Sequence, residues 1–197
     1  MHSLFTTYVE QKRLSVSPKM MEQLRWTASK MPEVDEVGVK WSAKNYVGGY
    51  TSYDSISRVD LQFSAFETLK KKIDAEVKKY TKKLGLDFPT GSLELSSMWV
   101  NVMPKNVYHA FHLHPLSVIS GTFYISVGKG KSASPLRIED PRASRFMGTP
   151  ARPMQIDLKP KNGDLILFES WLKHEVPPHQ NNEDRISVSF NYDWLNR

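Results

Sequence analysis

The sequence predicts a mainly β protein, a small β-sandwich or jelly roll with N-terminal helices packed on one face. Apolar residues recur at steps of three and four before Pro89, as in helices, and at steps of two after it, as in strands. The short apolar segments after Pro89 are separated by turn residues and not by helix-length segments. Parallel strands need such crossover helices, so a βαβ arrangement is excluded.

Two helices are expected in the first ninety residues. A helix over 18–31 follows Ser17, whose hydroxyl can cap it, and has proline at its first position. Residues 63–84 carry one apolar face with lysines opposite and end at Gly85, as an amphipathic helix does. Between these helices, the segment 44–56 holds two adjacent glycines flanked by tyrosines, which predicts a loop: a lid over a pocket or a surface turn.

The strands are expected in six segments of the second half. They are 93–103, 111–127, 136–139, 154–158, 164–168 and 185–193. With 197 residues, 22.6 kDa and 40% hydrophobic residues, the chain fits one compact domain. We therefore expect a single domain over 1–197, with 1–90 as helical support and 91–197 as the jelly-roll core that carries the chemistry.

The composition excludes several kinds of site. Cysteine is absent, which removes disulfides, thiolate zinc sites, iron–sulfur clusters and cysteine nucleophiles. No GxSxG elbow and no P-loop occur. The start of the chain lacks the apolar run of a signal peptide, and no stretch is long and apolar enough to span a membrane. We expect a cytoplasmic protein that does not interact with membranes.

The net charge of +6 is accompanied by a dense group of lysines between residues 70 and 83. Such a group is typical of a solvated helix face, and it could also attract an anionic surface or nucleic acid. No aromatic or arginine residues suited to base stacking lie among the lysines, which disfavours nucleic acid. The lysines mildly favour an acidic substrate, and a homodimer stays open.

Three histidines form a candidate metal site. His112 and His114 are two residues apart, so on an extended strand both imidazoles point to the same side. His174 follows the strand 164–168, which a PKNG turn would bring back into the same sheet. Three neutral imidazoles leave open coordination positions on a divalent ion, as a reactive centre requires. The alternative is that these are hydrogen-bonded core or surface histidines.

A polar face accompanies the histidines in the last strand. Arg185, Ser187, Ser189 and Asn191 alternate there with apolar residues. A guanidinium on the inner face of a closed sheet would be an uncompensated buried charge unless an acid met it, and a dicarboxylate ligand could do so through a bidentate fork. The alternative is that this face is solvated.

These residues resemble the iron(II)- and 2-oxoglutarate-dependent oxygenases, whose fold is a double-stranded β-helix and whose signature is HxD, a distal histidine and an arginine about ten residues later. The sequence reads His112-Leu113-His114, then His174, then Arg185-Ile186-Ser187. The segments HLHP, SGTFY and WLKH also resemble a small branch of that superfamily, over the stretch from Trp99 to Trp194.

The resemblance implies that His112, His114 and His174 bind Fe(II). It departs from the wider superfamily at His114, where the usual ligand is a carboxylate. A site without an anionic protein ligand leaves more positive charge on the metal, which should strengthen binding of an anionic keto acid. A carboxylate from elsewhere, such as Asp140, is an alternative member of the metal shell, and another metal is an alternative to iron.

The resemblance also implies a cosubstrate site and a reaction. Arg185, helped by Ser187, would hold the distal carboxylate of 2-oxoglutarate, and Asn101 and Tyr124 are weaker candidates for hydrogen bonds to it. The implied reaction is oxidative decarboxylation of 2-oxoglutarate by O2 to succinate and CO2, coupled to hydroxylation of a C–H bond of an unidentified substrate. It needs no catalytic side chain beyond the metal ligands.

Two other classes of function remain open at this point. Cupin-type metal enzymes, isomerases or dioxygenases, also build a site from HxH and a distal histidine, but they normally add a glutamate a few residues after HxH. The residues after His114 are Pro-Leu-Ser-Val, which contain no acid. The other class is a non-catalytic jelly-roll binding module in which the histidines are incidental.

Overall fold

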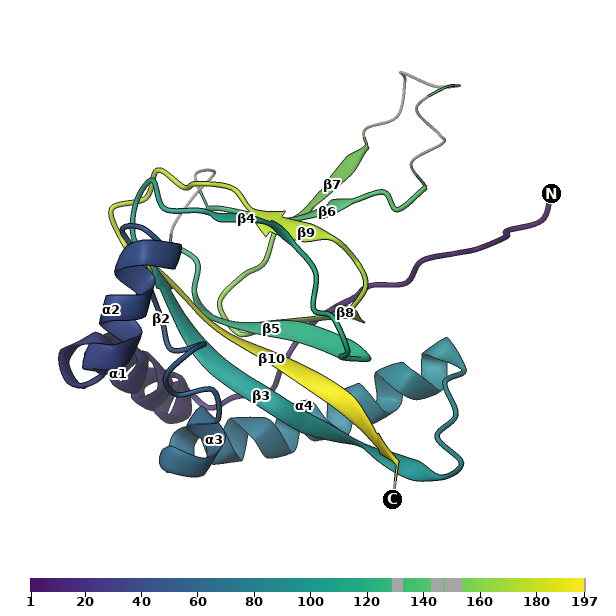
Figure 1. The fold of residues 1–197 in the computed structure, drawn as a ribbon, viewed down its shortest axis with the longest axis horizontal. Coiled ribbons are helices and arrows are strands. Elements are labelled where there is room, and N and C mark those ends of the chain that lie inside the picture. The colour runs from purple at the N-terminus through teal and green to yellow at the C-terminus, as the bar shows by residue number, and fades with distance from the viewer. Residues whose placement is uncertain (129–132, 143–146, 148–153, 197) are drawn as a thin grey trace.

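The computed structural model describes residues 1–128, 133–142, 147 and 154–196. It contains two antiparallel sheets that face each other, with helices along the outer side of the larger one (Figure 1). The helices are α1 (Pro18–Val34), α2 (Glu36–Asn45), α3 (Val59–Gln62) and α4 (Ser64–Leu84). The strands are β1 (Glu10–Arg13), β2 (Tyr50–Thr51), β3 (Gly91–Met103), β4 (His109–His112), β5 (Ile119–Ser126), β6 (Leu136–Glu139), β7 (Gln155–Leu158), β8 (Asp164–Glu169), β9 (His174–Val176) and β10 (Arg185–Asn196).

The six-stranded major sheet has the order β1-β8-β5-β10-β3-β2, and the four-stranded minor sheet has the order β4-β9-β6-β7. All strand pairs within the two sheets are antiparallel. The mainly β class predicted from the sequence is confirmed by these antiparallel sheets, which are consistent with the expected jelly-roll core.

Alternation along β10 separates a core from a polar face. Val188 and Phe190 on β10 are fully buried with Leu24 of α1 and with Phe66 and Ile73 of α4 in one hydrophobic cluster. The residues between them on β10 point to the opposite side of the sheet, toward the minor sheet. The helices therefore cover one side of the major sheet, and the other side is free to build a site.

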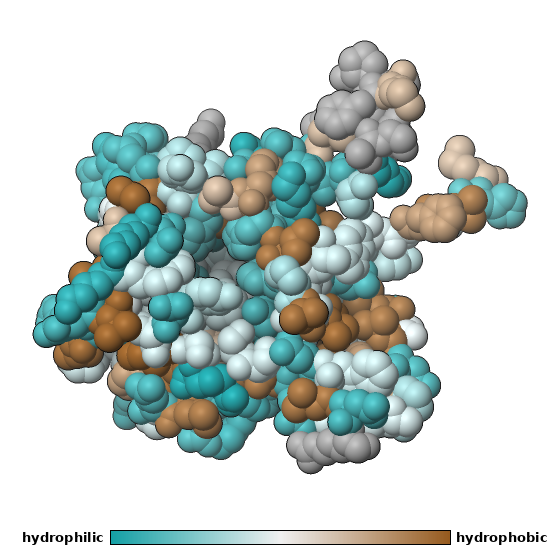
Figure 2. Space-filling model, in the orientation of Figure 1, coloured by the Kyte–Doolittle hydropathy of each residue, from teal (hydrophilic) through white to brown (hydrophobic). Residues whose placement is uncertain are grey.

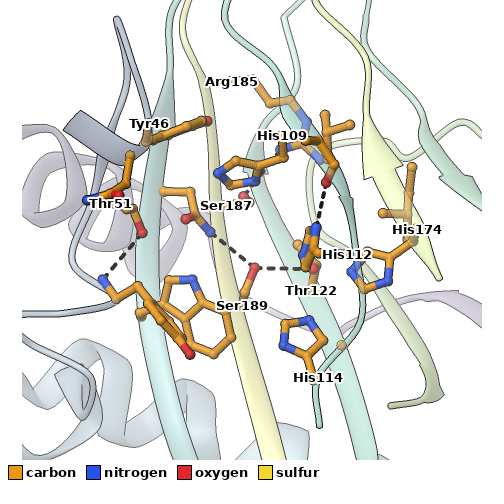
Figure 3. Close-up of a pocket in the computed structure, with 18 of the residues that line it drawn as sticks. Tyr46, Thr51, His109, His112, His114, Thr122, His174, Arg185, Ser187 and Ser189 are labelled. Carbon is orange, nitrogen blue, oxygen red and sulfur yellow. Dashed lines mark hydrogen bonds between the residues drawn. The ribbon is translucent and has the colours of Figure 1, made fainter. Parts of the chain in front are cut away.

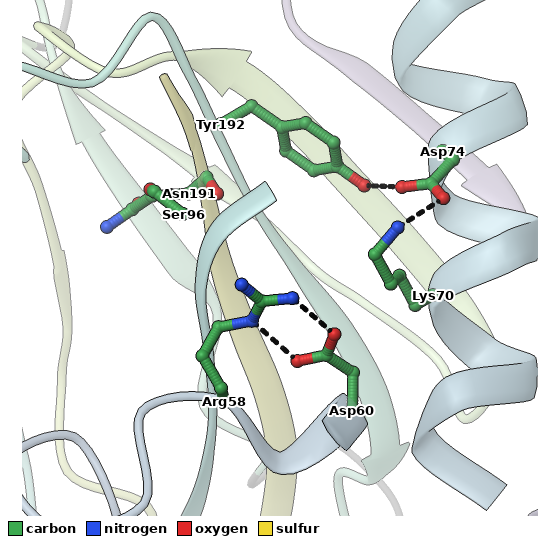
Figure 4. Close-up of polar contacts among 7 residues, drawn as sticks. All are labelled: Arg58, Asp60, Lys70, Asp74, Ser96, Asn191 and Tyr192. Atoms are coloured by element: carbon green, nitrogen blue, oxygen red, sulfur yellow. Dashed lines mark hydrogen bonds and ion pairs between the residues drawn. The ribbon is translucent and has the colours of Figure 1, made fainter. Parts of the chain in front are cut away.

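Polar contacts also fix the helices on the major sheet (Figure 4). The hydroxyl of Tyr192, on β10, donates a 2.5 Å hydrogen bond to Asp74 of α4, whose carboxylate also pairs with Lys70 at 2.7 Å. Arg58 forms a two-pronged contact with Asp60 at the start of α3, with N–O distances of 2.9 and 2.8 Å. The Tyr192–Asp74 contact therefore links α4 to β10, and the Arg58–Asp60 pair fixes the start of α3.

Both expected helices are present, with different ends. The Ser17 hydroxyl accepts a hydrogen bond from the Met20 amide at 3.2 Å, which caps α1 as predicted. The helix continues past Met31 to Val34, because Pro32 lies in the last turn, where its missing N–H removes only one hydrogen bond. Helix α4 ends at Gly85, whose left-handed conformation (φ 70°) is typical of a C-terminal cap.

The first ninety residues contain four elements that were not predicted: α2, α3, β1 and β2. Helix α2 was not expected, because only Gly38 and Ser42 are buried along it, so it has no apolar repeat. Its start is fixed by Asp35, whose carboxylate accepts a 2.9 Å hydrogen bond from the Gly38 amide. The short strands β1 and β2 were also missed; they lie at the two edges of the major sheet.

The segment 111–127 is not one strand, as predicted, but β4, a turn and β5. Pro115 has no N–H to donate, and Leu116 has a positive φ of 71°, so the chain reverses there. His114 therefore lies in the turn after β4. A second correction concerns β8, which belongs to the major sheet, whereas His174 begins β9 in the minor sheet.

No helix in the described part of the chain is both long and apolar enough to cross a membrane.

Candidate metal centre

Three imidazoles converge between the two sheets (Figure 3). His112 ends β4 and His174 begins β9, and the two residues are direct partners in the minor sheet. His114 follows in the turn after β4. Ligand nitrogen atoms of the three rings all lie within 4.8 Å of one another. One metal ion can therefore be reached by all three, as the spacing in the sequence predicted.

The backbone fixes which nitrogen each ring presents. Nδ1 of His112 lies 2.7 Å from the carbonyl oxygen of Ala110, and Nδ1 of His174 lies 2.8 Å from that of Leu172. Because a carbonyl only accepts hydrogen bonds, both rings carry their proton on Nδ1 and keep the Nε2 lone pair free for a metal. The amide of His114 donates a 3.0 Å hydrogen bond to the carbonyl of Ser170, which holds the turn in place.

Burial keeps these histidines neutral. Desolvation, with a smaller contribution from neighbouring histidines, lowers the pKa of His174 to about 3 and that of His114 to about 4. Burial also lowers the pKa of His112. Neutral imidazole is the form that binds a metal, so protons do not compete for this site at neutral pH.

We expect the free energy of unfolding of the metal-free protein to fall as the pH drops from 6.5 toward 4. In this window the unfolded chain protonates His114 and His174 while the folded chain keeps them neutral, since both folded-state pKa values lie below the ordinary 6.5. The slope should reach up to about 1.4 kcal/mol per pH unit for each histidine. Denaturant titrations at several pH values measure it, and an unchanged slope in a His114→Gln/His174→Gln variant would contradict the assignment.

The three rings face a cavity of about 400 Å³ between the sheets. The space-filling view shows a hollow on this face of the molecule (Figure 2). The cavity is lined by Trp41, Asn45, Tyr46, Thr51, Tyr53, Trp99, Asn101, His109, Ala110, His112, Leu113, His114, Gly121, Thr122, Leu136, His174, Val176, Arg185, Ser187 and Ser189.

Aromatic side chains form a row along the cavity from α2 to the histidines. The ring centroids of Trp41 and Tyr53 are 6.1 Å apart, and those of Tyr53 and Trp99 are 5.0 Å apart. Trp99 in turn lies 5.9 Å from the ring of His114. This apolar wall limits the access of water to the histidine side of the cavity.

Arg185 brings a buried positive charge to the same cavity. It is the first residue of β10 and only 2% exposed. Its Nη1 donates a 3.4 Å hydrogen bond to the Ser187 hydroxyl, and its guanidinium lies over the ring of Tyr124, 5.0 Å from the centroid. Among the described residues no carboxylate pairs with it, and its Nε has no hydrogen-bond partner. A buried cation without a counter-charge is costly, so this corner is suited to an anionic ligand.

Other polar atoms in the cavity wall also lack protein partners. The Tyr46 hydroxyl and Oδ1 of Asn101 are buried without a hydrogen bond to any residue that the structure describes. Nδ2 of Asn101 donates to the Ser189 hydroxyl at 3.1 Å, and that hydroxyl lies 3.3 Å from Thr122 Oγ1. Buried polar groups normally have hydrogen-bond partners, so these atoms indicate a polar ligand that forms the missing hydrogen bonds. The cavity thus fits both a metal ion and a carboxylate-bearing molecule.

The structure places two predicted residues away from the cavity wall. Tyr124 is fully buried beneath Arg185, and its hydroxyl has no partner within the described chain. Asp140 is not part of the group of residues that can share one metal, and its carboxylate instead receives two hydrogen bonds from the Arg142 guanidinium, each 2.8 Å long.

Tyr46 and His109 are among the cavity residues that sequence reasoning missed. His109 lies on β4, and its ring centroid is 4.1 Å from that of Tyr46. The signal for His109 was its position three residues before His112, since three histidines within residues 109–114 are unusual in a chain with six. The signal for Tyr46 was its place beside the paired glycines of segment 44–56.

Comparisons with known proteins agree with a metal site and a carboxylate site in this cavity. Residues 97–191 match the model of a family described as "Putative 2OG-Fe(II) oxygenase". No curated protein matches the sequence significantly.

Solved structures share the fold at low sequence identity. SnoN, a non-haem alpha-ketoglutarate-dependent epimerase from nogalamycin biosynthesis, aligns with a TM-score of 0.71 at 12% identity over 94% of this chain and 77% of its own. HygX from Streptomyces hygroscopicus, solved with nickel, 2-oxoglutarate and hygromycin B, gives 0.65 at 14% identity over 95% and 83%. A prolyl-4-hydroxylase from Pseudomonas putida gives 0.59 at 16% identity over 96% and 94%. At these identities the likeness establishes the fold.

The family match and the fold define the class of this protein, which is a non-haem oxygenase dependent on iron(II) and 2-oxoglutarate. Its matched core, residues 97–191, contains all three histidines and Arg185. More narrowly, residues 97–191, just under half of the chain, match the family of 2OG-Fe(II) oxygenases that this model describes.

Proposed function

We propose that the protein hydroxylates a C–H bond of a second substrate, with 2-oxoglutarate as cosubstrate and Fe(II) held by His112, His114 and His174. The observation that carries this proposal is the placement of two complementary features in one cavity. Three imidazoles lie within 4.8 Å of one another, and an unpaired buried guanidinium opens into the same space. When bound, the iron and 2-oxoglutarate together supply the activation of O2, with succinate and CO2 as coproducts.

The neutral histidines would determine how the centre treats its ligands. Because the group contains no carboxylate, the three rings leave the full charge of the metal to be balanced by the cosubstrate. The Nδ1 hydrogen bonds of His112 and His174 orient the rings and raise the basicity of their free nitrogens. A neutral set of ligands thus favours a dianionic keto acid over neutral competitors.

Arg185 would bind the distal carboxylate of 2-oxoglutarate. The guanidinium presents donors in a planar fork that matches a carboxylate, and the Ser187 hydroxyl beside it offers another donor. The Tyr124 ring supports the guanidinium from below. Asn101 contacts Ser189 on the same sheet face, where its amide can reach the cosubstrate.

The domain and partner predictions extend this proposal. Residues 1–90 would serve as support, since α1 and α4 cover the side of the major sheet opposite the cavity. An acidic substrate remains a prediction from the lysines of α4, and those lysines would attract it to the molecule and not hold it at the cavity. The homodimer and the cytoplasmic location also stay predictions.

The test is formation of succinate from 2-oxoglutarate without added second substrate. With ascorbate added as the two-electron reductant that turnover without a second substrate requires, we expect slow formation of succinate, followed by NMR, that needs both Fe(II) and O2 and is absent from a His174→Ala variant. His2→Ala, which changes an exposed histidine outside the cavity, is the matched control and should behave as the wild type. A wild-type protein that forms no succinate and gains no thermal stability from Fe(II) and 2-oxoglutarate would be a binding module instead.

A further inference from the structure

The side chain of Tyr46 is held inside the cavity by the turn that follows α2. Tyr46 caps the C-terminus of α2 and is only 4% exposed. Its amide donates a 2.8 Å hydrogen bond to the Ser42 carbonyl, and its own carbonyl accepts a 3.0 Å hydrogen bond from the Gly49 amide. The backbone on both sides of the ring is therefore fixed.

The two glycines of this turn are required by the position of the ring. A Cβ atom on Gly49 would lie 2.5 Å from Cε1 and 2.8 Å from Cζ of Tyr46, which is too close for any side chain. Gly48 has a φ of 82°, in the left-handed region that favours glycine. The glycine pair thus allows the chain to fold back against one face of the Tyr46 ring.

The Tyr46 ring also packs against His109, with the ring centroids 4.1 Å apart. Contacts with Gly49 and with His109 therefore restrict the direction of the phenol, which lies beside His109 in the close-up (Figure 3). The hydroxyl is buried and has no hydrogen-bond partner in the described chain. Leaving a buried hydroxyl unpaired costs about 1–3 kcal/mol, so its position calls for a ligand that accepts a hydrogen bond.

The charge of Arg185 indicates what that ligand is. Tyr46, His109 and Arg185 all line the cavity, and the close-up shows the three side chains at one end of it (Figure 3). Burial raises the pKa of Tyr46, and the hydroxyl therefore keeps its proton at neutral pH. It can donate a hydrogen bond, and a carboxylate held by Arg185 has several lone pairs to accept it.

We infer that Tyr46 is a further cosubstrate-binding residue, whose hydroxyl donates a hydrogen bond to the same carboxylate of 2-oxoglutarate that Arg185 binds. The inference rests on the proposed function. It assigns a role to a residue outside the family-matched core of 97–191, and it explains why paired glycines follow α2. The N-terminal region would then contribute a binding group as well as support.

The test compares Tyr46→Phe with wild type by calorimetry, under anaerobic conditions and with Mn(II) in the metal site. Two ligands are titrated: 2-oxoglutarate, and 2-oxobutanoate, which keeps the keto acid but lacks the distal carboxylate. We expect the Kd for 2-oxoglutarate to rise about tenfold, as for loss of one hydrogen bond to a charged group. The Kd for 2-oxobutanoate should stay within about twofold of wild type. Tyr108→Phe, at an exposed tyrosine outside the cavity lining, is the matched control and should change neither value.

A second variant addresses the turn itself. Gly49→Ala should displace the phenol and produce the same selective loss, whereas in a Tyr46→Ala background it should add nothing to the loss of 2-oxoglutarate affinity. This double-mutant comparison separates the ring contact from a general effect on folding, which thermal melting of each variant monitors.

The outcomes distinguish this inference from the proposed function. An unchanged 2-oxoglutarate Kd in Tyr46→Phe, or an equal loss for both ligands, would overturn the role of Tyr46 while leaving the function intact. A wild-type protein that binds Mn(II) but not 2-oxoglutarate would overturn the proposed function itself.

Discussion

Replacing His174 with alanine is expected to abolish Fe(II) binding while the protein stays folded. The change removes one of three nitrogens that can reach a common ion, and no carboxylate in the described chain joins the group to replace it. We expect metal affinity to fall by more than about a hundredfold, since even changes to residues that only orient a ligand cost 10–100-fold. Anaerobic titration with Fe(II), followed by calorimetry, measures this loss.

Stability should change little in the same variant. The main hydrophobic cluster lies on the helix side of the major sheet, and His174 is not part of it. Besides the other two histidines, its ring contacts Phe168, at a centroid distance of 4.6 Å. A loss of about 1–3 kcal/mol in the free energy of unfolding fits the removal of one buried side chain. If His174→Ala instead fails to fold while His2→Ala is normal, the histidine is structural and the metal assignment is wrong.

Replacing Arg185 with alanine is expected to abolish tight binding of 2-oxoglutarate while metal binding persists. Arg185 is the only lysine or arginine among the described residues that line the cavity. The metal-site histidines there are neutral at pH 7 and carry no positive charge. Two charge-assisted hydrogen bonds of about 1.5–3 kcal/mol each correspond to a rise in Kd of more than a hundredfold. In anaerobic titrations with Fe(II) and 2-oxoglutarate, the metal-to-ligand charge-transfer band should appear for wild type and weaken strongly for Arg185→Ala.

Arg185→Lys serves as the matched variant. Lysine keeps the charge but lacks the planar fork, so it should recover only part of the affinity. Because the arginine is buried without a carboxylate partner, its removal should cost the metal-free protein less stability than the loss of a paired buried charge. A band of equal strength in wild type and Arg185→Ala would show that the cosubstrate is bound elsewhere.

The elements that sequence reasoning found were those with a strong local pattern. The apolar repeat of α4 and the alternation along β10 predicted both elements, because one face of each is buried in the same core. Helix α2 has little buried surface of its own, so no periodicity could indicate it. It is held by contacts distant in sequence, such as the 2.7 Å hydrogen bond from Tyr50 to Asp35 at its start.

The candidate site was predictable in its identities but not in its full geometry. The HxH spacing gave His112 and His114 correctly as neighbours, although His114 lies in a turn and not on the strand. The sequence alone could not place Tyr46 in the cavity, because that depends on how the turn after α2 packs against β4. The sequence also could not predict that Asp140 lies outside the group of histidines, because its position depends on the pairing of β6 in the minor sheet.

The central claim is that His112, His114 and His174 hold one Fe(II) beside a cosubstrate bound by Arg185. A crystal structure of the protein soaked anaerobically with Fe(II) and 2-oxoglutarate tests it most directly. We predict a single iron anomalous peak bonded to one nitrogen of each histidine, with the distal carboxylate of 2-oxoglutarate on the guanidinium. Iron bound away from these rings, or a cosubstrate that leaves Arg185 without a carboxylate, would contradict the account.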